Sequence, residues 1–200
     1  MRYQVERLSK FYGNVEKNEC VLVIVGSFAP FHAGHVDAIN SAYNFIARLG
    51  KEVNACLCVP NSDEYVLNKV NNQRWDLHLR IDGIVNVLQK TECKMNYIVD
   101  DITGECFCGN LVTDYAIANL RLRVGEIQKN NIFVVVGSDK IEEAMQYLNT
   151  YNIICVRRPG YDIEAPLCSY ANVAVIDRMN MACDISSTDI RMEVNKADEY

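Results

Sequence analysis

Short, continuously apolar segments alternate with amphipathic ones along this chain, and that alternation constrains its fold more than any other feature. Residues 21–25 are apolar without interruption and rich in β-branched side chains, which is typical of a strand buried on both faces of a parallel sheet. From His35 to Leu49, apolar residues recur every three or four positions. This spacing predicts a helix with one buried stripe, ended by Gly50. The two segments together form a strand–loop–helix unit.

The same pattern repeats through the rest of the chain, with no linker, internal repeat or low-complexity segment. We therefore expect one domain over residues 1–200, with 1–18 as a polar, helical N-terminal extension and 20–195 as the core. The alternation predicts a Rossmann-like α/β fold with a mostly parallel sheet, right-handed crossovers and helices on both faces. The further predicted strands are 53–59, 97–99, 132–136, 152–156 and 173–176, and the further predicted helices are 74–89, 113–128, 141–148 and 187–194.

Charge and hydropathy exclude some classes of function. The chain carries 20 Lys and Arg against 26 Asp and Glu, for a formal net charge of −6. This mildly acidic balance disfavours nucleic-acid binding, which relies on a basic surface, but allows a local basic pocket for a small anion. No apolar run approaches the ~20 residues of a membrane-spanning helix, so we expect no membrane association.

The nine cysteines favour a reducing environment over a metal site. Their odd number and the lack of a recognisable signal peptide predict reduced thiols and a cytoplasmic location. Cys56 and Cys58 form a C-x-C pair, as do Cys106 and Cys108. The first pair lies inside an apolar run, where cysteine behaves as a small hydrophobic residue, and structural zinc sites usually have wider spacing. We therefore predict no metal site built by the protein.

The loop at residues 26–35, with the sequence GSFAPFHAGH, is the first candidate site. In parallel sheets ligands bind at the carboxyl ends of strands, where this loop lies. Gly26 permits a sharp turn and a close approach of a ligand to the backbone. Gly34 and His35 begin a helix whose free N–H groups suit a phosphate. His32 and His35 are two of only three histidines in the chain, which favours a ligand-binding role over simple satisfaction of loop polar groups.

The segment 184–191, with the sequence DISSTDIR, is the second candidate site. Its hydroxyl side chains, Ser186, Ser187 and Thr188, precede an apolar-periodic stretch, which is typical of a helix N-cap. The same cluster supplies hydroxyl and backbone donors at a helix N-terminus, with Arg191 one turn further. The segment therefore predicts a second binding site for an anion.

Together these segments resemble the nucleotidyltransferase superfamily with the HxGH motif, and more narrowly the nicotinamide or nicotinate mononucleotide adenylyltransferases. In that family the pattern GSFxPxHxGH stands near the start and ISSTxIR near the end. The resemblance covers residues 20–195. Three further segments match the family in order: 60–69, which ends in a substrate-binding lysine, 136–139 with the sequence VGSD, and 157–162 with the sequence RRPGYD.

The sequence departs from the family pattern at a few places. Ala29 stands where the family usually has Asn or Asp, Asn68 replaces the first of two frequent lysines, and Cys183 stands where Asn is frequent. The tryptophan that eukaryotic members place against the pyridine ring is missing after Asp101, and the only tryptophan of the chain is Trp75. These departures concern recognition of the pyridine ring more than adenylyl transfer.

The resemblance implies an enzyme that joins the AMP part of ATP to nicotinamide or nicotinate mononucleotide, giving NAD or deamido-NAD and pyrophosphate. It implies that Mg²⁺ is held through the ATP phosphates, and it allows a homo-oligomer, because family members range from monomers to larger assemblies. By the same resemblance Lys69 pairs with the mononucleotide phosphate and Asp139 accepts from the ribose or adenine. The catalytic residues would be His32, His35 and Arg191, and the substrate-binding residues Gly26, Ser27, Phe28, Gly34, Lys69, Gly137, Asp139, Arg158, Ser186, Ser187 and Thr188.

Two alternatives remain open at this point. One is a sibling transferase that shares HxGH, either a phosphopantetheine adenylyltransferase or a cytidylyltransferase acting on a lipid or polyol phosphate. The RRPGYD and ISSTDIR segments favour the pyridine enzymes over these siblings. The other alternative is a non-catalytic nucleotide-binding protein, which the intact histidines, Lys69 and Arg191 disfavour.

Overall fold

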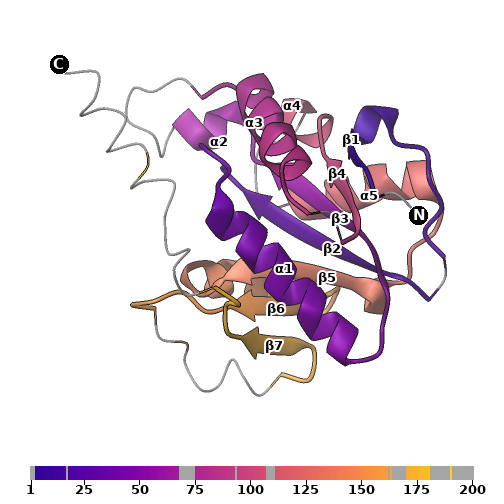
Figure 1. Ribbon diagram of the computed structural model, residues 1–200, viewed down its shortest axis with the longest axis vertical. Helices are drawn as coiled ribbons and strands as arrows, with labels where there is room; N and C mark the ends of the chain where they lie inside the picture. The colour runs from indigo at the N-terminus through magenta and orange to yellow at the C-terminus, as the bar shows by residue number, and fades with distance from the viewer. Residues whose placement is uncertain are drawn as a thin grey trace.

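The strands of this protein form one sheet in which every pair of neighbours is parallel. The computed structural model describes residues 3–16, 18–67, 75–92, 94–106, 111–161, 163, 170–180 and 190. Within them the seven strands have the order β1-β4-β3-β2-β5-β6-β7 (Figure 1). The strands are β1 (Val5–Arg7), β2 (Cys20–Gly26), β3 (Val53–Pro60), β4 (Asn96–Val99), β5 (Ile132–Gly137), β6 (Asn152–Val156) and β7 (Val173–Ile176).

Helices cover both faces of the sheet, which confirms the predicted fold class. Helices α1 and α3 lie on the face that Figure 1 turns toward the reader, and α5 packs on the opposite face. Alternate side chains of β2 point to opposite faces of the sheet: Leu22 packs in the cluster with α1 and α3, and Val23 packs in the cluster with α5. The helices are α1 (Ala33–Arg48), α2 (Asp63–Leu67), α3 (Leu77–Gln89), α4 (Thr103–Cys106), α5 (Val112–Val124) and α6 (Ile141–Ala144).

The order of the strands places a switch point at β2. The chain moves outward from β2 through β3 to β4, and then returns across the sheet to β5, β6 and β7. Ile24 of β2 pairs with Val135 of β5. Gly26 and Gly137 lie two residues further along and are the last residues of these neighbouring strands, so the two strands end next to each other. The carboxyl ends of strands at such a switch point are where open α/β sheets bind ligands.

The expectation of a helical N-terminal extension is wrong. Val5–Arg7 forms β1, which pairs in parallel with β4 at the edge of the sheet. Leu8 and Phe11 then pack into the apolar cluster beside α5, and the Asp101 carboxylate accepts hydrogen bonds from the Ser9 N–H and hydroxyl. Burial of these apolar side chains at the sheet edge outweighs the polar composition of the segment.

The predicted strands are confirmed, whereas several helix ends differ. α3 begins at Leu77 rather than 74, because the Asp76 carboxylate caps it by accepting from the Leu79 N–H at 3.0 Å. α5 ends at Val124, before Gly125 with φ of 85°. The helix expected over 141–148 is shorter, with α6 followed by a 3₁₀ turn at Met145–Tyr147. The helix expected over 187–194 lies outside the described residues, apart from Ile190.

Four of the cysteines are buried residues of the sheet. Cys20, Cys56, Cys58 and Cys155 are all buried and form no disulfide bond. Burial raises the pKa of the Cys56 thiol well above its ordinary value, so this group is a protonated core residue. In the part of the chain that the structure describes, no helix combines the length and apolar character needed to cross a bilayer.

Candidate functional site

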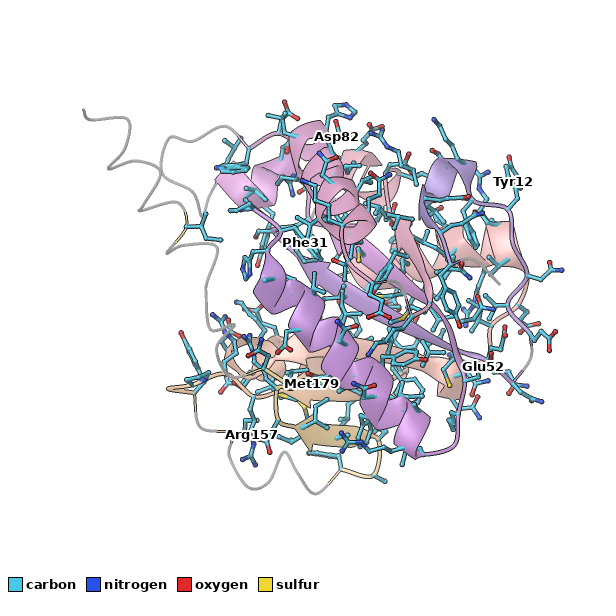
Figure 2. All side chains as sticks on the ribbon, viewed as in Figure 1. Tyr12, Phe31, Glu52, Asp82, Arg157 and Met179 are labelled. Atoms are coloured by element: carbon cyan, nitrogen blue, oxygen red, sulfur yellow. The ribbon has the colours of Figure 1, made fainter. Side chains whose placement is uncertain are left out.

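The loop between β2 and α1 has an apolar floor that supports the two histidines. Phe28 and Phe31 are buried, and their rings meet edge to face with centroids 5.2 Å apart. The Phe31 ring also stacks on the His35 imidazole, with centroids 5.0 Å apart, and Phe31 lies at the N-terminal end of α1 in Figure 2. A Cβ atom on Gly26 would lie 2.7 Å from the Phe28 ring, so this packing requires glycine at the end of β2.

Backbone N–H groups at the N-terminus of α1 hold the side chains of His32 and His35 in place. The N–H of Gly34 donates to His32 Nδ1 at 3.1 Å, and the N–H of His32 donates to His35 Nδ1 at 3.2 Å. A neutral imidazole that accepts at Nδ1 carries its proton on Nε2. The centroids of the two rings are 3.9 Å apart. The site therefore holds two adjacent Nε2–H donors, which suit phosphate oxygens.

The charge state of His35 is set by its surroundings. Burial lowers the pKa of the His35 imidazole well below its ordinary value, and repulsion from His32 in its protonated form and from the charges of Arg158 and Arg178 lowers it further, in that order. His35 is therefore neutral near pH 7. In that state its imidazole can donate one hydrogen bond and carries no positive charge.

The carboxyl ends of β5 and β6 form the other half of the site. Arg158 Nη1–H donates to Asp139 Oδ2 at 2.9 Å, and the Arg158 N–H donates to the Ser138 hydroxyl at 2.9 Å. A Cβ atom on Gly137 would lie 2.5 Å from Asp139 Oδ1 and 3.2 Å from Arg158 Cδ. The structure thus brings together three residues that the sequence had marked: Gly137, Asp139 and Arg158. Arg157, in contrast, is exposed and faces Asp177 at 3.7 Å.

Arg178, which sequence reasoning missed, adds a positive charge near the histidines. It follows β7, and the chain after it is attached to α1: the Met179 N–H donates to the Ser41 hydroxyl at 3.0 Å, and the Asn180 N–H donates to Asp37 Oδ1 at 3.2 Å. Figure 2 shows Met179 beside α1. The available signal was a basic residue two positions beyond the predicted strand 173–176.

Arg80 of α3 joins the ends of β2 and β3 from inside the protein. Its side chain is fully buried. Nη1 donates to the carbonyl oxygens of Ser27 at 2.9 Å and Asn61 at 2.7 Å. Nη2 donates to Asp63 Oδ1 at 2.7 Å, and Nε donates to the Trp75 carbonyl at 3.0 Å. The helix predicted over 74–89 contains Arg80, but the sequence gave no signal for these contacts.

Ala29 shows how the chain differs from the pyridine-nucleotide adenylyltransferases that it resembles. Where those enzymes usually have Asn or Asp, the Ala29 methyl group is fully buried against Val66 of α2, and Trp75 packs on the same cluster. The chain therefore places an apolar contact between the loop and α2 at this position.

Some predicted site residues lie outside the described part of the chain: Lys69, Ser186, Ser187, Thr188 and Arg191. The described ones lie at or just beyond the carboxyl ends of β2, β5 and β6, which are neighbouring strands of the sheet. Over these described ranges, no group of three or more His, Cys, Asp or Glu side chains is placed to hold a metal ion.

Comparison with known proteins supplies the family. A family model described as cytidylyltransferase-like matches residues 23–193, which include the whole loop with the two histidines. A search of curated proteins found no significant match. The matched region covers most of the chain, from within β2 to beyond β7, and leaves out β1 and the first three residues of β2. The chain belongs to the cytidylyltransferase-like family, within the nucleotidyltransferase superfamily that carries the HxGH motif.

Proposed function

We propose that this protein transfers the AMP part of ATP to nicotinamide or nicotinate mononucleotide and releases pyrophosphate. The observation that carries the proposal is the pair of neutral Nε2–H donors of His32 and His35 beside the switch point. Family membership supports nucleotidyl transfer in general. The choice of a pyridine acceptor is supported by the resemblance of segments 60–69, 157–162 and 184–191 to the pyridine enzymes.

The proposed reaction is an in-line displacement. A phosphate oxygen of the mononucleotide forms a bond to the α-phosphorus of ATP, and the bond from that phosphorus to the bridging oxygen of the β-phosphate breaks. Pyrophosphate leaves with the electron pair of that bond. Because a phosphate monoester is already a capable nucleophile, catalysis consists of positioning two anions and stabilising the charge that develops.

His32 and His35 would stabilise that charge. Their Nε2–H groups are held in place before substrate arrives, so little reorganisation accompanies the reaction. The buried packing of the His35 ring lowers the local dielectric and strengthens each hydrogen bond to a phosphate oxygen. Gly26 and Ser27 would add backbone donors, and Gly34 would place the N-terminus of α1 near the phosphates.

The remaining roles divide between the two nucleotides. Gly137 would let Asp139 and Arg158 pack closely at the end of β5. Asp139 would accept hydrogen bonds from the ribose or adenine of ATP, and Arg158 would add positive charge nearby. The resemblance assigns the mononucleotide phosphate to Lys69 and the β- and γ-phosphates to the donors of segment 186–191. Mg²⁺ would enter bound to the ATP phosphates as part of the substrate, and we assign no side chain to it.

The proposal is tested by measuring pyrophosphate release in a matrix of nucleotides and acceptors. The nucleotides are ATP and CTP, and the acceptors are nicotinamide mononucleotide, nicotinate mononucleotide, phosphopantetheine and glycerol phosphate. We expect release with ATP and a pyridine mononucleotide, with formation of the dinucleotide. Release with phosphopantetheine alone, or with CTP and glycerol phosphate alone, would assign the protein to a sibling activity. Binding of ATP without release from any pair would identify a non-catalytic nucleotide-binding protein.

A further inference from the structure

Arg80 is a buried cation that lies outside the set of residues expected to touch substrate. Only 1% of the residue is exposed, and burial of a guanidinium group is unfavourable unless its N–H groups are hydrogen-bonded. Four contacts meet that requirement, three of them to backbone carbonyls. An apolar residue of similar volume would fill the same space without the desolvation penalty. The arrangement therefore points to a role for Arg80 in fixing what it touches.

The first contact fixes the start of the loop with the two histidines. The Ser27 carbonyl belongs to the peptide that joins Ser27 to Phe28, and in a trans peptide the N–H of Phe28 points away from that carbonyl. Phe28 has φ of 49°, in the left-handed region that a bulky side chain rarely occupies. Such a conformation persists only when its surroundings hold it. Two hydrogen bonds stabilise this part of the loop: Arg80 Nη1 donates to the Ser27 carbonyl, and the Asn61 N–H donates to the Gly26 carbonyl at 2.9 Å.

The other contacts fix the segment that follows β3. Asn61 and Asp63 stand at the start of segment 60–69, and Asp63 is the first residue of α2. Val66 of the same helix packs on Ala29 of the histidine loop. One guanidinium group therefore connects the loop proposed for the ATP phosphates with the segment proposed for the mononucleotide.

We propose that Arg80 is a positioning residue for nucleotidyl transfer, which sets the geometry of the two substrate loops relative to each other from within the protein. This inference rests on the proposed function. It predicts that loss of the guanidinium fork lowers kcat more than it raises KM, because both substrates still bind but meet in a poorer geometry. A displacement of 1 Å in such a site lowers the rate by about 10²-fold.

The test compares three variants of the full chain. Arg80→Lys keeps the charge but replaces the planar fork with a single point donor, which cannot serve four acceptors in different directions. Asp63→Asn removes the charge of one partner, which is half exposed, and leaves the three carbonyl contacts intact. Asp82→Asn is the control, because Asp82 lies on the exposed side of the same helix and pairs with Arg7. We expect kcat to fall about 10²-fold in Arg80→Lys, by a smaller factor in Asp63→Asn, and to stay unchanged in Asp82→Asn.

NMR signals of the histidines distinguish a positioning role of Arg80 from a purely structural one. This measurement does not require the acceptor substrate to be known. The ¹H–¹³C signals of His32 and His35 should move in folded Arg80→Lys, while the melting temperature of Asp63→Asn stays near that of the parent. A fall in melting temperature with kcat and both imidazole signals unchanged would overturn the proposal and leave Arg80 as a structural residue. If the parent protein releases no pyrophosphate, the proposed function fails, and the imidazole signals still decide whether Arg80 positions the loop.

Discussion

The two halves of the site are built from different kinds of contact. On the β2 side, the histidine loop rests on buried aromatic rings, on the buried Arg80 and on backbone hydrogen bonds. On the β5–β6 side, the central contact is the ion pair of Asp139 and Arg158, whose side chains retain 21% and 23% exposure. The half proposed to stabilise the transferred phosphate is therefore buried and closely packed, whereas the half proposed to hold the nucleoside is partly solvated and easier to alter.

The largest effect on activity should follow from loss of a hydrogen-bond donor on the closely packed β2 side of the site. His35→Ala removes one Nε2–H, and we expect kcat/KM to fall by about 10²–10³-fold, as for other preorganised donors to a developing anion. His78→Ala is the matched control, since the His78 side chain is 73% exposed on α3 and has only a distant contact with Glu105. Steady-state pyrophosphate release measures both. Equal activity of the two variants would remove His35 from the proposed machinery.

The glycines at the ends of β2 and β5 test the two halves side by side. In Gly26→Ala the new methyl group meets the buried Phe28 ring, and overpacking of this kind destabilises by about 1–3 kcal/mol. In Gly137→Ala it meets the Asp139–Arg158 pair, which can shift toward solvent. We therefore expect a lower melting temperature and lower kcat for Gly26→Ala, and mainly a higher KM for ATP for Gly137→Ala.

Gly83→Ala is the control for both glycine variants. A Cβ atom on Gly83 of α3 would meet no other atom within 4 Å, so alanine should stabilise the helix by about 1 kcal/mol or less. Its activity should match that of the parent. The comparison of the two halves would be wrong if Gly137→Ala lost more stability than Gly26→Ala.

The depressed pKa of His35 predicts that acid destabilises the protein. The folded state binds a proton at His35 less readily than the unfolded state, whose imidazole has a pKa of about 6.5. As the pH falls below that value, the unfolded state takes up the proton first, and stability is lost by up to about 1.4 kcal/mol per pH unit from this group. Above pH 7 the contribution is constant.

Urea unfolding at pH 7.5 and pH 5.5 measures that loss. The free energy of unfolding should fall more steeply in the parent protein than in His35→Gln, which has no group to titrate at this position. Parallel dependence in the two proteins would contradict the assignment of a depressed pKa to His35.

The smallest effect belongs to the partly solvated half. Asp139→Asn removes the charge that faces Arg158, and because the pair is partly exposed, the loss of stability should stay below about 1 kcal/mol. The KM for ATP should rise more than kcat falls. Asp177→Asn, at an exposed and longer contact with Arg157, is the control and should change neither. A kcat loss in Asp139→Asn as large as that in His35→Ala would mean that the two halves are not functionally distinct.

Local patterns in the sequence predicted the core and the histidine loop because their signals are local. Unbroken runs of β-branched residues marked the central strands, and Gly26, His32 and Gly34 marked the turn into α1. The short edge strand β1 was missed, because its pairing with β4 depends on a neighbour some ninety residues away. Arg80 and Arg178 were missed as contributors to the site for the same reason, since their partners come from other segments of the chain.

The proposed site depends on His32 and His35 presenting two neutral Nε2–H donors to the phosphates of a nucleotide. Nitrogen-15 NMR of the protein labelled at histidine, recorded at pH 7 with and without a non-hydrolysable ATP analogue, measures this arrangement. We expect the neutral Nε2–H tautomer at both positions and a shift of both Nε2 signals on binding, with the His78 signals unchanged. An imidazolium ion or an Nδ1–H tautomer at either position, or Nε2 signals that do not respond to the bound nucleotide, would contradict it.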